Sequence, residues 1–132
     1  MKKYPLLFIL LSSVAAFAQT GKFSALQPLD VPDSLRIFNR KLFGDSLTSS
    51  FIIEIKKEVK LHRHEYHSEH VYIVSGKAEM KLGDQQIQVN SGDIIFIPKG
   101  IPHNVKVTST APLRVISIQS PAFDGKDRVM ME

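Results

Sequence analysis

The chain has 132 residues, no cysteine and a formal net charge of +4. This length is sufficient for one domain whose hydrophobic core needs no disulfide bonds. The basic excess is small, and the densest basic stretch, residues 56–63, is interrupted by Glu58 as a solvated strand face would be. The composition therefore argues against a nucleic-acid-binding protein.

Residues 1–18 have the pattern of a cleavable signal peptide. Lys2 and Lys3 precede an apolar stretch, and Ala16-Phe17-Ala18 supplies the small residues of a cleavage site. The apolar stretch is shorter than the roughly 20 residues that span a bilayer and contains two serines, which argues against a membrane anchor. We therefore expect cleavage after Ala18 and a periplasmic or secreted mature protein that is not attached to the membrane. Loss of the two lysines would lower its net charge from +4 to +2.

The next segments are an N-terminal arm and a first strand. Residues 19–34 contain two prolines and few periodic apolar positions, so we interpret them as an arm. Residues 35–43 are ambiguous, because Leu35 and Ile37 alternate as on a strand whereas Leu35, Phe38 and Leu42 have helical spacing. We favour the strand.

The remaining pattern predicts many short strands. They are expected at residues 51–55, 59–64, 70–75, 78–82, 86–89, 94–97, 103–108 and 113–119, and turns rich in Gly, Pro, Asp and Asn separate several of them. This pattern predicts an all-β fold, a single antiparallel barrel or sandwich without a long helix.

Three histidines and one glutamate form the most informative constellation. His62 and His64 are two residues apart, so both imidazoles leave the same face of an extended strand. Glu69 and His103 can complete a set of ligands that suits a divalent transition metal. His103 follows a loop with two prolines and a glycine, which has little conformational freedom to lose and can hold the imidazole in place.

In this arrangement the residues resemble the two sequence motifs of the cupins, small antiparallel β-barrels with a metal in the mouth. The first motif is Gly, five residues, His-x-His, three or four residues, Glu, six residues and Gly. The second is Gly, five residues, Pro-x-Gly, two residues, His, three residues and Asn. The matching residues are His62, His64, Glu69 and Gly76 in the first motif and Gly92, Pro98, Gly100 and His103 in the second. Lys56 replaces the first Gly and Val107 the final Asn; neither is a ligand position.

The resemblance covers roughly residues 35–120 and implies a single cupin barrel of the jelly-roll type. It implies that His62, His64, Glu69 and His103 bind one divalent metal, which could be Fe, Mn, Ni, Cu or Zn. Residues 121–132 would form a C-terminal tail, and its Ser-Pro-x-Phe start resembles the ending of many small cupins. We expect Phe123 to lay this tail over the barrel, and the charged residues of the tail, Asp124, Lys126, Asp127 and Arg128, to lie in solvent.

The use of the metal is not determined by the fold. Four protein ligands leave one or two positions for water, dioxygen or a substrate oxygen, as catalysis requires. One hypothesis is a dioxygenase-like enzyme for an enediol, catechol or similar substrate, with Glu69 as ligand and catalytic base; a sugar isomerase would use the same metal to polarise a carbonyl. The other is a non-catalytic module that binds a small molecule or the metal. The apolar residues near the ligands slightly favour oxygen chemistry or an aromatic substrate.

Two further histidines are expected to be bystanders. His67 lies in the loop between the His pair and Glu69, where it could replace His64 or Glu69 as a ligand only if the loop folded inward. His70 follows Glu69 on a strand and should point to the opposite face. This strand is apolar on both faces, which predicts a second sheet on one side and the partner of a homodimer on the other.

Overall fold

The computed structural model describes residues 21–22, 26 and 29–132. The predicted signal peptide and cleavage site lie outside these residues, as does part of the predicted arm. The described residues include no helix whose length and hydropathy would let it cross a membrane.

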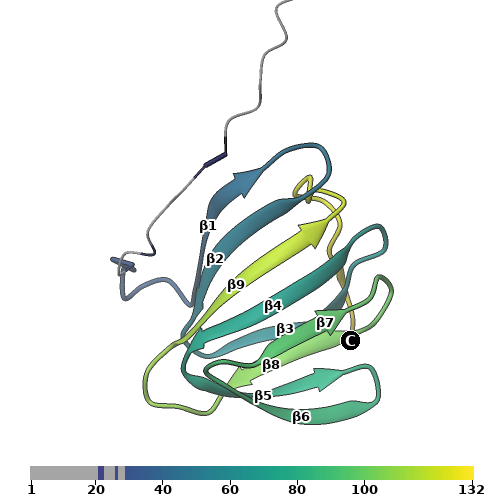
Figure 1. The fold of residues 1–132 in the computed structure, drawn as a ribbon. Coiled ribbons are helices and arrows are strands. Elements are labelled where there is room, and N and C mark those ends of the chain that lie inside the picture. Colours follow the sequence, from purple (N-terminus) through teal and green to yellow (C-terminus); the bar gives the residue numbers. More distant parts are fainter. Residues whose placement is uncertain (1–20, 23–25, 27–28) are drawn as a thin grey trace, which may run out of the picture.

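In the described residues, ten strands form two antiparallel sheets of five strands each, packed face to face (Figure 1). The first sheet has the order β1-β2-β9-β4-β7 and the second β10-β3-β8-β5-β6. The strands are β1 (Ile37–Gly44), β2 (Ser49–Ile55), β3 (Glu58–Arg63), β4 (Ser68–Ser75), β5 (Lys77–Leu82), β6 (Gln85–Asn90), β7 (Ile94–Ile97), β8 (His103–Val107), β9 (Leu113–Ser120) and β10 (Val129–Met130). The predicted all-β jelly-roll fold is confirmed.

The ambiguous segment is a strand, as favoured. β1 pairs with β2 in an antiparallel register that places Ile37 opposite Ile55, with an irregularity between Lys41 and Phe43. The two replaced motif positions also lie in ordinary backbone, because none of the described residues other than glycine has a positive φ. Lys56 therefore needs no glycine-like conformation, and its Nζ donates a hydrogen bond of 2.9 Å to the Pro32 carbonyl.

The hydrophobic core lies between the two sheets. Its buried members include Ile73, Leu113 and Val115, which alternate with more exposed neighbours as strand periodicity requires. Along β9 the inward-facing residues change from apolar Leu113 and Val115 to Ser117 and Gln119, all of them buried. The space between the sheets is thus apolar along most of its length and polar at one end, where the histidines lie.

The opposite face of β4 is exposed. His70 and Tyr72 lie outward on β4, flanked by residues of β7 and β9. Four apolar side chains on this face keep 43–70% of their surface exposed, and we call them the outer apolar face: Tyr72, Ile94, Phe96 and Ile118. The placement of His70 agrees with the strand alternation, and the homodimer stays a prediction.

Candidate metal centre

Two of the predicted ligands are direct neighbours across strands. His62 near the end of β3 lies opposite His103 at the start of β8 in the antiparallel register. Their ring centroids are 4.2 Å apart, and both residues are buried. Residues separated by a long stretch of sequence are therefore adjacent because β3 and β8 pair.

His64 follows β3 directly and is tied to the loop that carries His103. The Gly100 amide donates a hydrogen bond of 2.6 Å to the His64 carbonyl. Gly100 has a φ of 81°, a backbone conformation that glycine adopts without strain. The Pro-x-Gly loop of the second motif is thus anchored on a residue of the first.

The three imidazoles are oriented by backbone carbonyls. The Nδ1 atoms of His62, His64 and His103 lie 2.8, 2.5 and 3.0 Å from the carbonyl oxygens of Lys60, Asp127 and Ile101, respectively. A carbonyl only accepts, so each Nδ1 must be the protonated nitrogen. In the neutral imidazoles this leaves the Nε2 lone pair available for a metal. The potential ligand atoms of the three histidines lie within 4.8 Å of one another.

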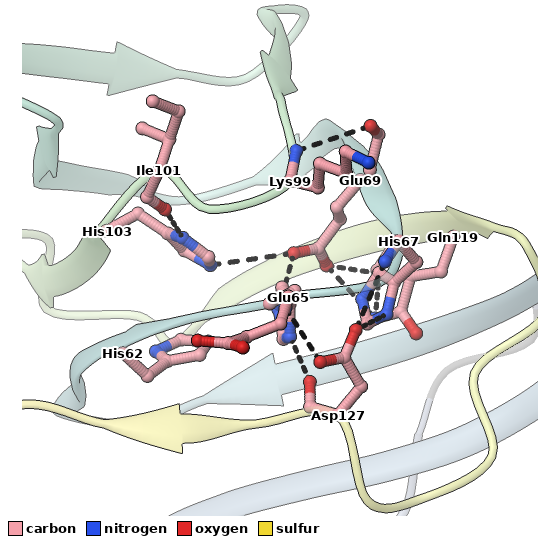
Figure 2. A network of polar contacts seen from close by, with 12 residues as sticks. His62, Glu65, His67, Glu69, Lys99, Ile101, His103, Gln119 and Asp127 are labelled. Atoms are coloured by element: carbon pink, nitrogen blue, oxygen red, sulfur yellow. Dashed lines mark hydrogen bonds and ion pairs between the residues drawn. The ribbon is translucent and has the colours of Figure 1, made fainter.

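Glu69, at the start of β4, completes the cluster. Its Oε2 lies 3.4 Å from Nε2 of His64 and 3.6 Å from Nε2 of His103, and Figure 2 shows its carboxylate turned toward His103. Its other oxygen accepts hydrogen bonds from the hydroxyl of Ser117 and from Nε2 of Gln119. The carboxylate is therefore fixed by β9 on one side and faces the histidines on the other.

The pKa shifts follow from this geometry. Burial, together with the nearby His103, lowers the pKa of His62 to about 3. Burial also lowers the pKa of His103. Burial would likewise lower the pKa of His64, but contact with Glu69 and the Asp127 carbonyl raises it. Without a metal, the first additional proton that the three imidazoles take up thus goes to His64, which lies beside the ionised Glu69.

The pKa of Glu69 supports that ionised state. Burial would raise this pKa, but the hydrogen bonds with His64 and Ser117 outweigh the effect and lower it to about 2. A metal cation that replaced the His64 proton would find the three imidazoles already gathered, with the Glu69 carboxylate beside two of them.

The C-terminal tail supports the cluster through Asp127. The Asp127 carboxylate accepts hydrogen bonds of 2.7, 2.9 and 3.1 Å from the backbone amides of Glu65, Tyr66 and His67, respectively. It also pairs with Nδ1 of His67 at 2.7 Å, and Figure 2 shows it beside that ring. The expectation that Asp127 is a solvated turn charge is wrong, because it is only 7% exposed and holds the loop between two ligands.

His67 is not a surface residue either. It is 2% exposed and stacks on His64, with ring centroids 4.1 Å apart. The loop folds inward, which was the condition for His67 to replace His64 or Glu69 as a ligand. The His67 Nδ1, however, contacts Asp127 rather than the predicted ligands. His64, His67 and Asp127 form a second group of potential ligands by distance alone. Their hydrogen bonds to one another indicate a supporting role.

Phe123 of the tail packs edge-on against His67, with ring centroids 5.4 Å apart, consistent with the expected covering role of the tail.

The cluster opens on a cavity of about 140 Å³ between the sheets. All four predicted ligands line it, together with apolar side chains such as Val71, Ile73 and Val105. Four polar residues that the sequence did not mark as part of the site also line it: Asn39, Asn104, Gln119 and Arg128. Ser117 and Gln119 could have been marked by one signal, since they interrupt the inward apolar row of β9.

The residues present fit a divalent metal. The three grouped imidazoles, together with the Glu69 carboxylate beside two of them, are a donor set that suits Mn, Fe, Ni, Cu or Zn. In each imidazole the nitrogen that would not bind the metal, Nδ1, donates a hydrogen bond to a backbone carbonyl. Metal-ligating histidines almost always make such a bond. The His-rich group can therefore hold a metal; its identity and the exact ligand set stay predictions.

Comparisons with known proteins agree with this architecture. The chain is 36% identical over 84 residues to an uncharacterised protein of Aquifex aeolicus, covering 64% of this chain and 69% of that protein. It is 28% identical over 81 residues to mannose-1-phosphate guanylyltransferase 2 of Escherichia coli O157:H7, covering 61% of this chain but only 17% of the enzyme.

A solved structure, KdgF from Halomonas sp., superposes with a TM-score of 0.70 at 22% identity, covering 80% of this chain and 97% of that one. At this identity, the superposition shows that the two proteins share a fold. The family model described as "Cupin domain" matches residues 50–119, which contain both motifs and all four predicted ligands. The chain belongs to the cupin family.

Proposed function

We propose that the protein is an exported metal-dependent enzyme that acts on a small, oxygen-bearing organic molecule. One observation carries the proposal: the four residues that could hold a metal line the wall of a largely apolar cavity. A purely structural metal site is closed by protein ligands, whereas a catalytic site keeps a position open toward a substrate. The cavity of about 140 Å³ is similar in size to one that holds benzene.

The chain's own residues would bind, orient and shield such a substrate. When bound, the metal would supply a Lewis acid that polarises a substrate oxygen or, if it is redox-active, the means to react with dioxygen. Glu69 is ionised and its Oε2 faces the histidines, so it is suited to bind the metal. Its position also makes it the proposed catalytic base, although a pKa lowered to about 2 reduces its basicity. Val71 and Ile73 follow Glu69 on β4, and Val105 follows His103 on β8; these apolar side chains would exclude water from the cavity beside the ligands.

Dioxygenase-like chemistry on a catechol or an enediol is the reaction class that we propose first. The apolar wall suits an aromatic or otherwise weakly hydrated substrate, and vicinal oxygens could occupy the open positions of a metal. The experiment is to load the protein with Fe(II), Mn(II), Ni(II) or Cu(II) and to measure dioxygen uptake with catechol. Uptake that requires metal and is lost in Glu69→Gln supports this class.

A sugar isomerase-type reaction is the second candidate, and the relatives favour it. One of them is named for a sugar phosphate, mannose 1-phosphate. Asn39 and the unbonded side-chain oxygen of Gln119 would offer hydrogen bonds to hydroxyl groups in the cavity. Isomerisation of a reducing sugar without dioxygen uptake would support this candidate. Tight binding of small molecules without turnover under any metal would leave the non-catalytic binding module instead.

Export and the natural metal can be tested together. We propose that the mature protein begins after Ala18 and resides in the periplasm or outside the cell. Mass spectrometry of the protein from fractionated host cells would give its N-terminus and compartment, and elemental analysis of the same sample would give its metal. An intact N-terminus in the cytoplasmic fraction would contradict the export proposal.

A further inference from the structure

Among the described residues that line the cavity, Arg128 is the one arginine, and no lysine lines it. The Arg128 backbone is fixed on both sides. Asp127 precedes it and is anchored to the ligand loop by three amide hydrogen bonds. Val129 follows it and pairs with Arg63 in the β10 to β3 ladder. The tail thus places a guanidinium at the mouth of the cavity, although nothing in the local sequence marks it.

Among the described residues, no ion pair or side-chain hydrogen bond involves the Arg128 guanidinium. The same holds for Arg36 and Arg40, which lie outside the cavity lining, whereas Arg63 and Arg114 are paired. Arg63 bonds to Glu65 at 2.6 Å and Arg114 to Glu54 at 2.8 Å. Arg128 keeps an exposed surface while lining the cavity. Partial burial lowers its pKa, so its charge has lost only part of its hydration. A partly desolvated cation without a partner gains most from an anionic ligand.

The groups around Arg128 do not supply that anion. Glu69 attracts the guanidinium through space, but its oxygens are already engaged with Ser117, Gln119 and the histidines. His62 and His103 lie close enough that the Arg128 charge lowers the pKa of each. A cavity that combines this guanidinium with a divalent metal would carry an excess of positive charge, which favours an anionic substrate.

We propose that Arg128 binds the carboxylate of a small organic acid whose other oxygens face the histidine cluster, so that Arg128 selects acids over their neutral analogues. This inference rests on the proposed small-molecule function of the same cavity. A guanidinium presents two parallel N–H donors that match the two oxygens of a carboxylate. The cavity of about 140 Å³ suits an acid of about the size of benzoate.

The test compares pairs of probes that differ in charge. Binding of benzoate and of benzyl alcohol to the metal-free protein is followed by NMR shifts of the cavity methyl groups. Binding of 3,4-dihydroxybenzoate and of catechol to the metal-loaded protein is followed by calorimetry. The variants are Arg128→Gln and Arg128→Lys, and the matched control is Arg40→Gln, an exposed arginine on β1 outside the cavity lining. Metal content is measured for every protein.

We expect the wild type and Arg40→Gln to bind each acid roughly tenfold or more tightly than its neutral analogue, the gain of a charge-assisted hydrogen-bonded pair. Arg128→Gln should lose this preference while its metal content stays unchanged, and Arg128→Lys should keep part of it. A preference that is absent from the wild type, or that survives in Arg128→Gln, would overturn the proposal. Tighter binding of phenyl phosphate than of benzoate would overturn the assignment to carboxylates.

The two arms separate the two proposals. If the protein takes up no metal, the proposed metalloenzyme fails, and the benzoate arm on the metal-free protein still decides the role of Arg128. If metal binds but acids and neutral analogues bind equally, only the role of Arg128 fails.

Discussion

His64 donates a hydrogen bond from Nδ1 to the backbone carbonyl of Asp127 at 2.5 Å. The two residues are 63 positions apart, and this bond links a predicted metal ligand to the C-terminal tail. The same Asp127 holds three amides of the loop that leads from His64 to Glu69. The tail is therefore part of the structure that positions the ligands, and β10 fastens it to β3 beside His62.

The first prediction concerns Asp127→Asn. An amide has one oxygen acceptor and an NH₂ group that would face backbone amides, so part of the carboxylate's bonding is lost. We expect metal affinity to fall about 10- to 100-fold, as for other outer supports of metal ligands, and the free energy of unfolding to fall by about 1–3 kcal/mol. Calorimetry and chemical denaturation measure the two effects. Asp124→Asn, an exposed tail position, is the control, and an equal effect of both variants would contradict the prediction.

The second prediction is a pH dependence of metal affinity. The pKa of His64 is raised above its ordinary 6.5, whereas those of His62, at about 3, and His103 are lowered. As the pH falls through the raised pKa of His64, a metal must displace one proton, so affinity falls tenfold per pH unit. The slope should stay near one until the lower pKa values are approached, as measured by competition with a chelator. A slope of two or three just below neutral pH would contradict this order of protonation.

The third prediction tests the ligand set. His62→Ala combined with His103→Ala removes two imidazoles that face each other across β3 and β8. We expect elemental analysis to find that the double variant retains no stoichiometric metal. His70→Ala is the matched control because His70 lies exposed on the opposite face of β4, and it should retain metal like the wild type. Retention of wild-type metal content by the double variant would show that the metal binds elsewhere.

The fourth prediction concerns Gly76, the last glycine of the first motif. Its φ is 91°, and a Cβ there would lie 2.8 Å from the Pro112 carbonyl oxygen and 2.9 Å from the Cα of Leu113. Gly76→Ala should therefore destabilise the fold by more than the roughly 1–2 kcal/mol of the backbone strain alone. Gly92→Ala separates the two causes, because Gly92 has a φ of 96° and open space around its Cβ position. Equal losses of unfolding free energy in both variants would show that close packing at Gly76 contributes nothing.

The fifth prediction is the homodimer, in which a second copy covers the outer apolar face. Phe96 and Ile94 are 52% and 70% exposed there. Sedimentation velocity over a range of concentrations should show a dimer that Phe96→Glu converts to a monomer, because a charge would be buried without a partner. Leu47→Glu, which changes a 74% exposed residue outside this face, should leave the dimer intact. A wild type that is monomeric at every concentration would exclude the dimer.

Local sequence patterns predicted most of the fold. The strands from residue 51 to 119 lie close to their predicted ranges because alternation and turn residues are properties of neighbouring positions. The segment at residues 35–43 was ambiguous because its own pattern supports two periodicities. Only pairing with β2 makes it a strand.

By itself, the sequence determined the kinds of residue that are the predicted metal ligands, their spacing and the barrel that carries them, because these depend on short motifs and on strand alternation. Only the tertiary structure decided that Asp127 supports the ligand loop, that His67 is buried against His64, and that Arg128 reaches the cavity. These placements result from contacts between residues distant in the sequence, and the charged tail has no local periodicity that distinguishes a solvated turn from a buried support. The physical reason is that a local pattern shows which face a side chain occupies, whereas long-range packing determines what that face meets.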